Sequence, residues 1–441
     1  MKKQRFNIIC IVLVWSVFFI GNSQQVVKPS KAISLALEHN YGVQIANNTV
    51  GIAENNKNVL NTGYLPTLTG NAGATYNLDD TEAEFSNGET TTLKGAESSR
   101  YNASINLNYI LFDGLGRRYD YKRLKEVYRL SELQARETIE NTITQLLTVY
   151  YDVARRTENL KSLEETLEIS KDRLTRQEYQ FEYGQNTKLD VLNAEVDINN
   201  DSINIINLKQ RLINAKRDLN FVTGNSIIQD FEVDTTVTFL LQLNKQELLN
   251  KLYKNNVILI QNEKNIAINE FTLKANKSGY LPTIGLSGTY GWNKNNNNAA
   301  SFVAVSSNSG LSGGLNLSWN IFDGGSTITR VKNAQINLEN QKLLKEQLRL
   351  DVERIYNNAW DDYQNKLKIY QVQEENIKTA SNNFSRTQEK FKLGQVNSIV
   401  FRQAQLNLLT SELSRNQAKY DAKLAEVVVL QLSGELLNVQ F

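Results

Sequence analysis

YLPTLTGNAGATYN at residues 64–77 and SINLNYILFDG at residues 104–114 return later in the chain as YLPTIGLSGTYGW at 280–292 and LNLSWNIFDGG at 315–325. The two YLPT boxes are 216 positions apart, and the two Phe-Asp-Gly boxes are 210 positions apart. Similarity at a nearly fixed offset, with unlike sequence between the boxes, indicates an internal duplication.

Within each copy, apolar side chains alternate with Asn, Ser, Thr and Gly. A period of two is typical of a β-strand with one apolar face. Each copy therefore predicts a β-hairpin, at residues 66–112 and 282–322. The polar stretches inside the hairpins, residues 78–99 and 295–309, are predicted to be long external loops.

Each alternating run is about 10–12 residues long, which is the length that a tilted strand needs to cross a bilayer. A half-buried antiparallel sheet in a soluble domain has the same alternation, so periodicity alone leaves both environments open. For a membrane barrel, we expect the lipid-facing residues to include Tyr101, Ile105, Leu107, Tyr109, Leu286, Tyr290, Leu317 and Trp319.

The N-terminus has the three parts of a secretory signal peptide: basic residues, an apolar run from Ile8 to Ile20, and small residues before a cleavage point. We predict that residues 1–23 are the signal peptide and that cleavage follows Ser23. The only cysteine, Cys10, lies inside the apolar run and not at its end, which argues against a lipid-anchored N-terminus.

Composition excludes several classes of function. Cleavage after Ser23 removes three of the 49 basic residues and none of the 47 acidic ones, so the mature chain has a net charge of −1. We therefore expect no nucleic acid partner. A mature chain without cysteine and with His39 as its one histidine cannot build a disulfide framework, a thiol nucleophile or a Cys/His metal site. We expect no cofactor, no metal and no enzymatic activity.

Helical periodicity fills the rest of the chain, and its only three prolines, Pro29, Pro66 and Pro282, lie outside the predicted helices. The long helices are too long for a globular domain, at about 1.5 Å per residue. We predict a first repeat at 24–223, a linker at 224–244 with a strand near 231–239, a second repeat at 245–434 and a tail at 435–441. The predicted helices are 30–62, 117–183, 188–222, 245–278, 327–393 and 398–432.

Two hairpins cannot span a membrane alone, because every backbone polar group in lipid needs a partner and an isolated four-stranded sheet has two open edges. Bacterial single-chain barrels begin at about eight strands, so closure needs at least two copies, and three copies would supply twelve strands. Helices that continue from such a ring would extend its lumen on the periplasmic side. We therefore expect the assembled chains to form a conduit.

The chain resembles the TolC family of outer-membrane efflux proteins over nearly the whole mature length. The resemblance rests on the duplicated hairpins, on FEYGQNTKLDVLNAE at 181–195 and FKLGQVNSIVFRQAQ at 391–405, and on LNFVTG and VLQLSG after them. It implies an α+β membrane protein of the cell outer membrane: a homotrimer whose hairpins form one twelve-strand barrel, continuous with a periplasmic α-helical barrel. It also implies a belt around the helices from residues 224–243 and the C-terminal end. The implied partners are a periplasmic adaptor and an inner-membrane pump of the RND, ABC or MFS type.

In the family, the two helix–helix tips form the periplasmic entrance and dock the adaptor. This maps to Tyr183, Gly184, Gln185, Asn186 and Thr187 at the first tip and to Leu393, Gly394, Gln395, Val396 and Asn397 at the second. The two glycines also suit helix C-caps.

The resemblance places Asp190, Val400 and Gln403 at the entrance. Some family members carry paired aspartates where this chain has Val400 and Gln403, and a tyrosine and an arginine where it has Phe391 and Val396. We therefore expect a gate closed mainly by helix packing and only weakly sensitive to divalent cations.

Two alternatives remain at this stage. A trimeric autotransporter-like adhesin also combines coiled coil with four strands per chain, but its strands are consecutive and C-terminal, whereas these hairpins are about 200 residues apart. A coiled-coil scaffold is possible if the strands do not lie in lipid. Neither the exported substrate nor the pump class can be derived from the sequence.

Overall fold

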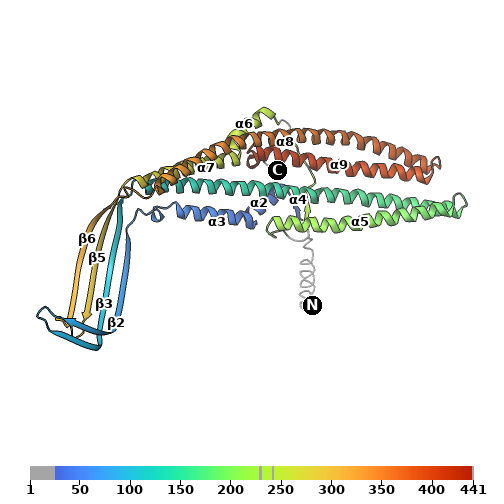
Figure 1. Cartoon of the computed structure of the whole chain (residues 1–441). Helices are drawn as coiled ribbons and strands as arrows, with labels where there is room; N and C mark the ends of the chain where they lie inside the picture. Colours follow the sequence, from blue (N-terminus) through green and yellow to red (C-terminus); the bar gives the residue numbers. More distant parts are fainter. Residues whose placement is uncertain (1–24, 228–230, 241–242, 440–441) are drawn as a thin grey trace, which may run out of the picture. The chain divides into compact units, whose positions relative to one another are not determined.

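The computed structural model describes residues 25–227, 231–240 and 243–439 (Figure 1). The predicted signal peptide, residues 1–23, lies outside the described residues. Two compact units can be distinguished: one holds the described residues within Met1–Ala46, Arg136–Val257 and Leu350–Phe441, and the other holds Asn47–Ala135 and Ile258–Arg349. The division into sequence repeats remains a prediction, since these units cut across both repeats.

The second unit contains a four-stranded antiparallel sheet in the order β2-β3-β5-β6, with β2 and β6 at its edges (Figure 1). Its register places apolar residues of neighbouring strands opposite one another: Leu68 pairs with Leu107, and Ile105 pairs with Tyr290. Leu286 on β5 also pairs with Leu315 on β6, so all four strands contribute to one apolar face. The bounds are β2 Thr67–Glu84, β3 Thr90–Phe112, β5 Thr283–Asn296 and β6 Val305–Ser318.

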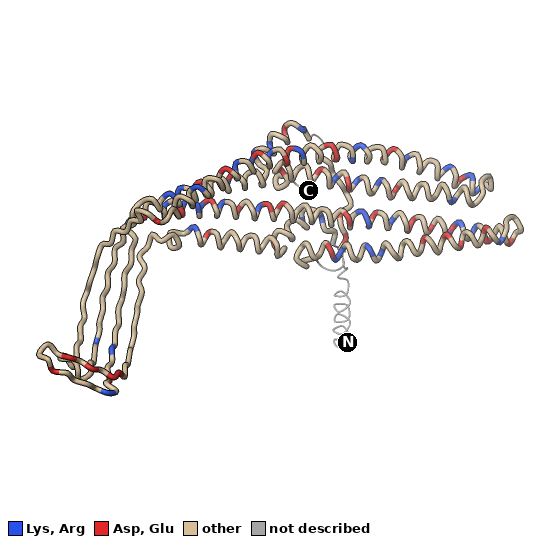
Figure 2. Tube along the Cα trace, viewed as in Figure 1, with Lys and Arg blue, Asp and Glu red and all other residues tan. Residues whose placement is uncertain are grey.

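The strands are longer than predicted. β2 and β3 contain 18 and 23 residues, so most of the predicted loop at 78–99 is paired strand, and only the turn around Asn87 and Gly88 separates them. β5 and β6 likewise extend into the predicted loop at 295–309. The prediction failed because it read the end of the apolar pattern as the end of the strand, whereas ladder hydrogen bonds join backbone groups and continue past it. Figure 2 shows the acidic residues gathered at this end of the sheet.

Four long helices follow the predicted bounds to within one residue. α4 and α8 each contain 67 residues, and α5 and α9 each contain 35. The Phe-Asp-Gly boxes start α4 and α8: Asp113 accepts from the backbone N–H of Arg117 at 2.8 Å, and Asp323 accepts from that of Thr327 at 2.9 Å. A side-chain acceptor satisfies an otherwise unpaired N–H in the first helical turn. The bounds are α4 Gly116–Glu182, α5 Lys188–Val222, α8 Ser326–Lys392 and α9 Ser398–Leu432.

The predicted helices at 30–62 and 245–278 are broken at Asn40 and Asn256, contrary to the prediction, and the first also ends as an α-helix at Asn56. Each of these asparagines is in an extended conformation and donates to the last turn of a helix, Asn40 to the carbonyl of Val222 at 2.8 Å and Asn256 to that of Leu432 at 2.9 Å. Asn40 also accepts from the N–H of Gly42, which caps the next helix. The resulting elements are α2 Pro29–His39, α3 Tyr41–Asn56, η1 Val59–Asn61, α6 Lys245–Asn255, α7 Val257–Lys277 and η2 Ser278–Tyr280.

The predicted linker strand near 231–239 shortens to β4 Phe231–Val233, which pairs in parallel with β1 Gln25–Val27. The chain beyond β4 is held by side chains of α9. Tyr420 donates to the carbonyl of Thr235 at 3.1 Å, Lys423 donates to that of Thr238 at 2.7 Å, and Glu426 accepts from the N–H of Leu240 at 2.7 Å. These contacts satisfy backbone groups that lack a ladder partner. A short helix, η3 Leu436–Asn438, follows α9.

Among the helices that the structure describes, none has the length and apolar composition needed to cross a membrane.

Candidate functional site: the helix tips and the sheet face

The two tips are built alike. At the first tip, Gly184 has φ +71°, its N–H donates to the carbonyl of Phe181, and the N–H of Gln185 donates to that of Gln180. At the second tip, Gly394 has φ +72°, and the same two hydrogen bonds run from Gly394 and Gln395. This pair of bonds satisfies the last carbonyls of α4 and α8 with a glycine in the left-handed region.

Most of the residues predicted to dock an adaptor are exposed in these turns. The exposed residues are Tyr183, Gly184, Gln185, Thr187, Leu393, Gly394, Gln395 and Asn397. Asn186 and Val396 are half-buried instead. Asn186 donates to the carboxamide oxygen of Gln177 at 2.6 Å, and Val396 packs on an aromatic cluster.

The predicted entrance residues have different environments. The Asp190 carboxylate accepts from the N–H of Thr187 at 3.2 Å and from its hydroxyl at 2.7 Å, so Asp190 belongs to the N-cap of α5. At the second tip, Val400 is exposed, and its N–H donates to the Asn397 side chain at 3.0 Å. The exposed Gln403 side chain donates to Asn407 at 2.9 Å.

Aromatic packing holds the second tip together. The rings of Phe391 on α8 and Phe401 on α9 are stacked with centroids 4.5 Å apart, and Phe384 lies 5.5 Å from Phe401. All three side chains are buried, and Ala404 completes the cluster. Phe391 therefore joins α8 to α9 by apolar contact.

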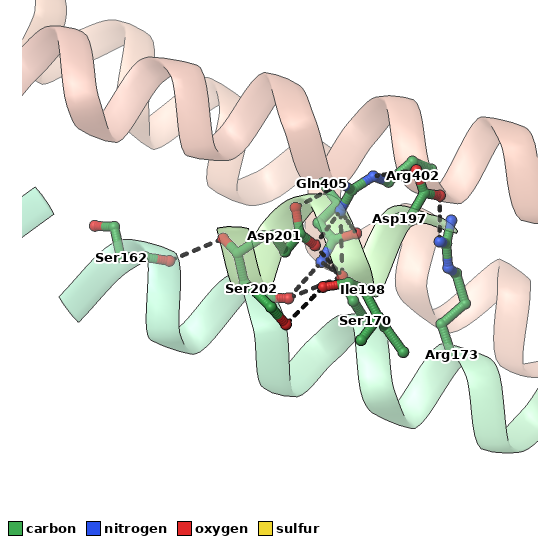
Figure 3. Close-up of polar contacts among 10 residues, drawn as sticks. Ser162, Ser170, Arg173, Asp197, Ile198, Asp201, Ser202, Arg402 and Gln405 are labelled. Carbon is green, nitrogen blue, oxygen red and sulfur yellow. Dashed lines mark hydrogen bonds and ion pairs between the residues drawn. The ribbon is translucent and has the colours of Figure 1, made fainter. Parts of the chain in front are cut away.

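A buried polar network lies further along the same helices (Figure 3). Its centre is Arg402 on α9, whose guanidinium donates to both carboxylate oxygens of Asp201 on α5, at 2.7 and 2.9 Å. The same guanidinium donates to Ser170 on α4 at 3.2 Å and to Gln405 at 3.0 Å. Gln405 donates in turn to the carbonyl of Thr166 at 2.8 Å. We call Thr166, Ser170, Asp201, Arg402 and Gln405 the clasp.

The clasp ties α9 to both helices of the first tip. Ser170, Asp201 and Gln405 are each no more than 3 % exposed. A bidentate, charge-assisted pair supported by further hydrogen bonds is the form in which a buried ion pair is tolerated. The Nε of Arg402 makes no hydrogen bond and lies 3.6 Å from the carboxylate of Asp197. Beside the clasp, Arg173 pairs with Asp197, and these two residues line a cleft with Arg402 and the predicted entrance residues Asp190 and Gln403. The structure thus brings two of the three predicted entrance residues together with a charge network that the sequence analysis missed.

The clasp could have been predicted by comparing the two repeats residue by residue. At the offset of 210, Arg402 corresponds to Leu192, and Asp201 corresponds to Ser411. A charged residue at a helix-packing position that its repeat partner fills with an aliphatic one indicates a buried ionic contact.

The residues predicted to face lipid share one side of the sheet. Tyr101, Ile105, Leu107 and Tyr109 alternate along β3, and the register places Tyr109 opposite Leu286. Tyr290 and Leu317 lie on the same face, because Tyr290 pairs with Ile105 and Leu317 pairs with Ile284. Trp319 lies one residue beyond the end of β6, and its indole N–H donates to the carbonyl of Tyr280 at 3.2 Å.

In the part of the chain that the structure describes, no group of three or more His, Cys, Asp or Glu side chains is arranged to hold a metal ion. His39 lies at the end of α2, with its ring 3.8 Å from the carboxylate of Glu38.

Comparison with known proteins identifies the family. A family model described as "Outer membrane efflux protein" matches residues 32–225 and 248–435. The outer membrane efflux protein BepC of Brucella suis is 22% identical over 414 residues, which cover 92% of this chain and 85% of BepC.

Solved channels share the fold. The CmeC outer membrane channel of Campylobacter jejuni superposes with a TM-score of 0.75 at 16% identity, covering 92% of this chain and 86% of CmeC. The outer-membrane channel OprN gives 0.73 at 17% identity, covering 92% of this chain and 89% of OprN. The open state of the MtrE channel of Neisseria gonorrhoeae gives 0.67 at 16% identity, covering 92% and 89%.

These matches confirm the TolC-like fold predicted from the duplicated hairpins and tips, and they set aside the adhesin and scaffold alternatives. The chain belongs to the outer membrane efflux protein family and is an outer-membrane efflux channel with its helical part in the periplasm.

Proposed function

We propose that three copies of the chain form a passive conduit, which carries substrate from a periplasmic adaptor and an inner-membrane pump to the exterior. The observation that supports this most directly is the sheet itself. It has an apolar face, a polar face and two edge strands, β2 and β6, that have no further strand partner among the described residues. Such a sheet is stable in lipid only if its edges are paired.

Pairing between copies closes the sheet without a break in its pattern. Neighbouring strands in the order β2-β3-β5-β6 are antiparallel, so β6 of one copy and β2 of the next also run in opposite directions. Three sheets of four strands give a barrel of twelve. In this barrel the apolar face contacts outer membrane lipid, and Asn71, Asn106 and Thr289 line a water-filled lumen.

The tips are the proposed docking surface for the adaptor. Gly184 and Gly394 have open space where a side chain would begin, and Tyr183 and Leu393 are exposed although they are apolar. Ile399 and Val400 in the first turn of α9 are exposed as well, and apolar side chains gathered in one exposed patch are typical of a protein contact. The pump that acts through this adaptor is of the RND, ABC or MFS type, and the tips do not favour one of these types.

In-cell photo-crosslinking tests the docking surface. A photoreactive amino acid replaces Gln185 or Gln395 at the tips, and the matched control is Asn87 in the β2–β3 turn. We expect a periplasmic adaptor to be captured from both tip positions and not from position 87. Equal capture from position 87, or none from either tip, would contradict the docking proposal.

The entrance is proposed to close by apolar packing rather than by an acidic ring. Val400 and Gln403 carry no charge, and Phe391 is buried against Phe401. We therefore expect divalent or trivalent cations added on the periplasmic side to change the conductance in planar bilayers only slightly. The variant Val400→Asp + Gln403→Asp should become sensitive to these cations, and strong block of the unaltered protein would rule out the apolar gate.

A further inference from the structure

The polar face of the sheet is uncharged along most of its length. The register aligns its side chains in rows of four, one from each strand, and five such rows lie between Thr67 and Thr75. In the first four rows every member is Gly, Ser, Thr or Asn. The fifth row consists of Thr75, Arg100, Asn295 and Ser306. Arg100 is therefore the only charged residue of the five rows.

Arg100 lies at the end of this face that is farther from the junction of β3 with α4. Its row is the last on the polar face in which all four strands are paired. The β3–β5 pairing ends one residue later, at Ser99 and Asn296, whose side chains belong to the opposite face. Beyond them only β2 and β3 continue as a ladder. In the proposed barrel, Arg100 therefore stands at the outer mouth of the lumen.

One hydrogen bond orients the guanidinium of Arg100. Its Nε donates to the Oδ1 of Asn295 at 3.1 Å, across the β3–β5 ladder. Among the described residues Arg100 forms no ion pair, and its two terminal nitrogens have no hydrogen-bond acceptor. Asp79 shares the polar face, but it follows Thr75 by four residues of β2, which is about 14 Å of strand. Its carboxylate therefore leaves the charge of the guanidinium uncompensated.

A small polar cavity lies beside this guanidinium. Its volume is about 150 Å³, and its lining includes Thr75, Asn77, Ser98 and Asn295 together with Arg100. Arg100 is the only charged residue of the lining, and the other residues supply hydroxyl and carboxamide groups. A guanidinium with such donors around it suits the oxygen atoms of carboxylates and phosphates. The cavity therefore fits an anionic group.

Three copies of this row would change both the width and the charge of the lumen. A barrel of about eight strands is just wide enough for side chains to fill it, whereas one of about sixteen leaves an aqueous channel. A barrel of twelve lies between these limits, so the length of the lining side chains decides how open it is. Arg100 is the longest side chain of the five rows. Three such side chains would narrow the mouth, while short ones line the rest.

We propose that Arg100 of three copies forms a cationic ring, the arginine ring, at the narrowest point of the β-barrel lumen. This ring favours the release of substrates that carry carboxylate or phosphate groups. Rings of Arg or Lys side chains are a common means by which pores select anions. An anion in the arginine ring interacts with three guanidiniums at once, whereas a cation of the same size is repelled. The inference rests on the homotrimeric barrel of the proposed function and adds a substrate class to it.

Calorimetric titration of the purified protein with tripolyphosphate tests the arginine ring. The titration is done at low salt, because salt screens exposed charges. We expect one anion to bind per three chains, since each anion engages three guanidiniums. Arg100→Asn should weaken this binding at least tenfold. The matched control is Lys294→Asn, because Lys294 pairs with Tyr101 on the opposite face and its loss should leave the binding unchanged.

Current through planar bilayers relates this binding to passage through the mouth. Tripolyphosphate added on the exterior side should reduce the current of the unaltered protein and of Lys294→Asn. At least tenfold more should be needed for Arg100→Asn. Unchanged binding or block in Arg100→Asn, or one bound anion per chain, would overturn the arginine ring. The conduit would still stand if that protein conducts and has the native mass of a trimer. A native mass of one chain and no current would contradict both the arginine ring and the proposed homotrimer.

Discussion

At the scale of single residues, the two repeats use unlike chemistry at equivalent positions. Arg402 and Asp201 form the buried centre of the clasp. Their equivalents in the other repeat, 210 positions away, are Leu192 and Ser411. A buried charge pair is costly to break, because removing one partner leaves the other without compensation. The repeats therefore supply natural replacements with which the clasp can be tested.

Arg402→Leu should destabilise the tip region by about 3–5 kcal/mol, because Asp201 would stay buried without its partner. The double variant Arg402→Leu + Asp201→Ser should recover most of this loss, since both charges are removed together. Hydrogen exchange of the first turns of α9 in the purified protein measures the effect.

The matched control for the clasp is Arg354→Leu. Arg354 forms an exposed ion pair with Asp351 at 2.6 Å on α8, and such surface pairs contribute only about 0–1 kcal/mol. Equal protection of α9 in the Arg402→Leu variant and the unaltered protein would show that the clasp does not hold the tip.

Two glycines with the same backbone conformation should respond differently to alanine. Gly184 and Gly434 both have φ +71°, but an added Cβ meets nothing within 4 Å at Gly184 and lies 2.5 Å from the carbonyl oxygen of Asn255 at Gly434. Gly184→Ala should cost about 1–2 kcal/mol from the left-handed conformation alone. Gly434→Ala should cost clearly more, and thermal unfolding in detergent would measure the difference. Equal losses of stability in the two variants would mean that the backbone at the helix break near Asn256 can move to accommodate the added Cβ.

At the scale of elements, periodicity predicted most of the chain. The bounds of α4, α5, α8 and α9 were predicted to within one residue, because a period near 3.6 sustained for tens of residues has few interpretations. The apolar face of the sheet was predicted from alternation, and the register confirms that its members lie together.

Tertiary contacts explain what periodicity could not predict. The breaks at Asn40 and Asn256 depend on hydrogen bonds to Val222 and Leu432, which are more than 170 positions away in sequence. The outer halves of β2 and β3 depend on ladder pairing that apolar alternation does not mark. The clasp was missed for the same reason, since Arg402 by itself is one of several charged residues on α9.

A single charge on the apolar face of the sheet tests its proposed exposure to lipid. Leu107→Arg should lower the stability of the barrel by about 2–4 kcal/mol and reduce the amount of protein in the outer membrane fraction. Asn108→Arg, one residue later on the opposite face of β3, should be recovered normally. Normal recovery of both variants would place this face outside the lipid.

At the scale of the whole molecule, the unsatisfied surfaces of one chain are complementary to one another. The edge strand β6 can pair with β2 of the next copy, and both α5 and α8 carry exposed apolar side chains, such as Ile206 and Ile369. A single copy leaves both kinds of surface open, whereas a closed ring covers both. We therefore propose that the ring, and not the single chain, is the folded unit.

Imaging the purified protein in lipid nanodiscs by cryo-electron microscopy tests this claim most directly. We expect three copies around one axis and a barrel of twelve strands, with Leu107 towards lipid and Asn108 towards the lumen. A sheet that closes within one chain, or a barrel with its asparagine face towards lipid, would contradict the account.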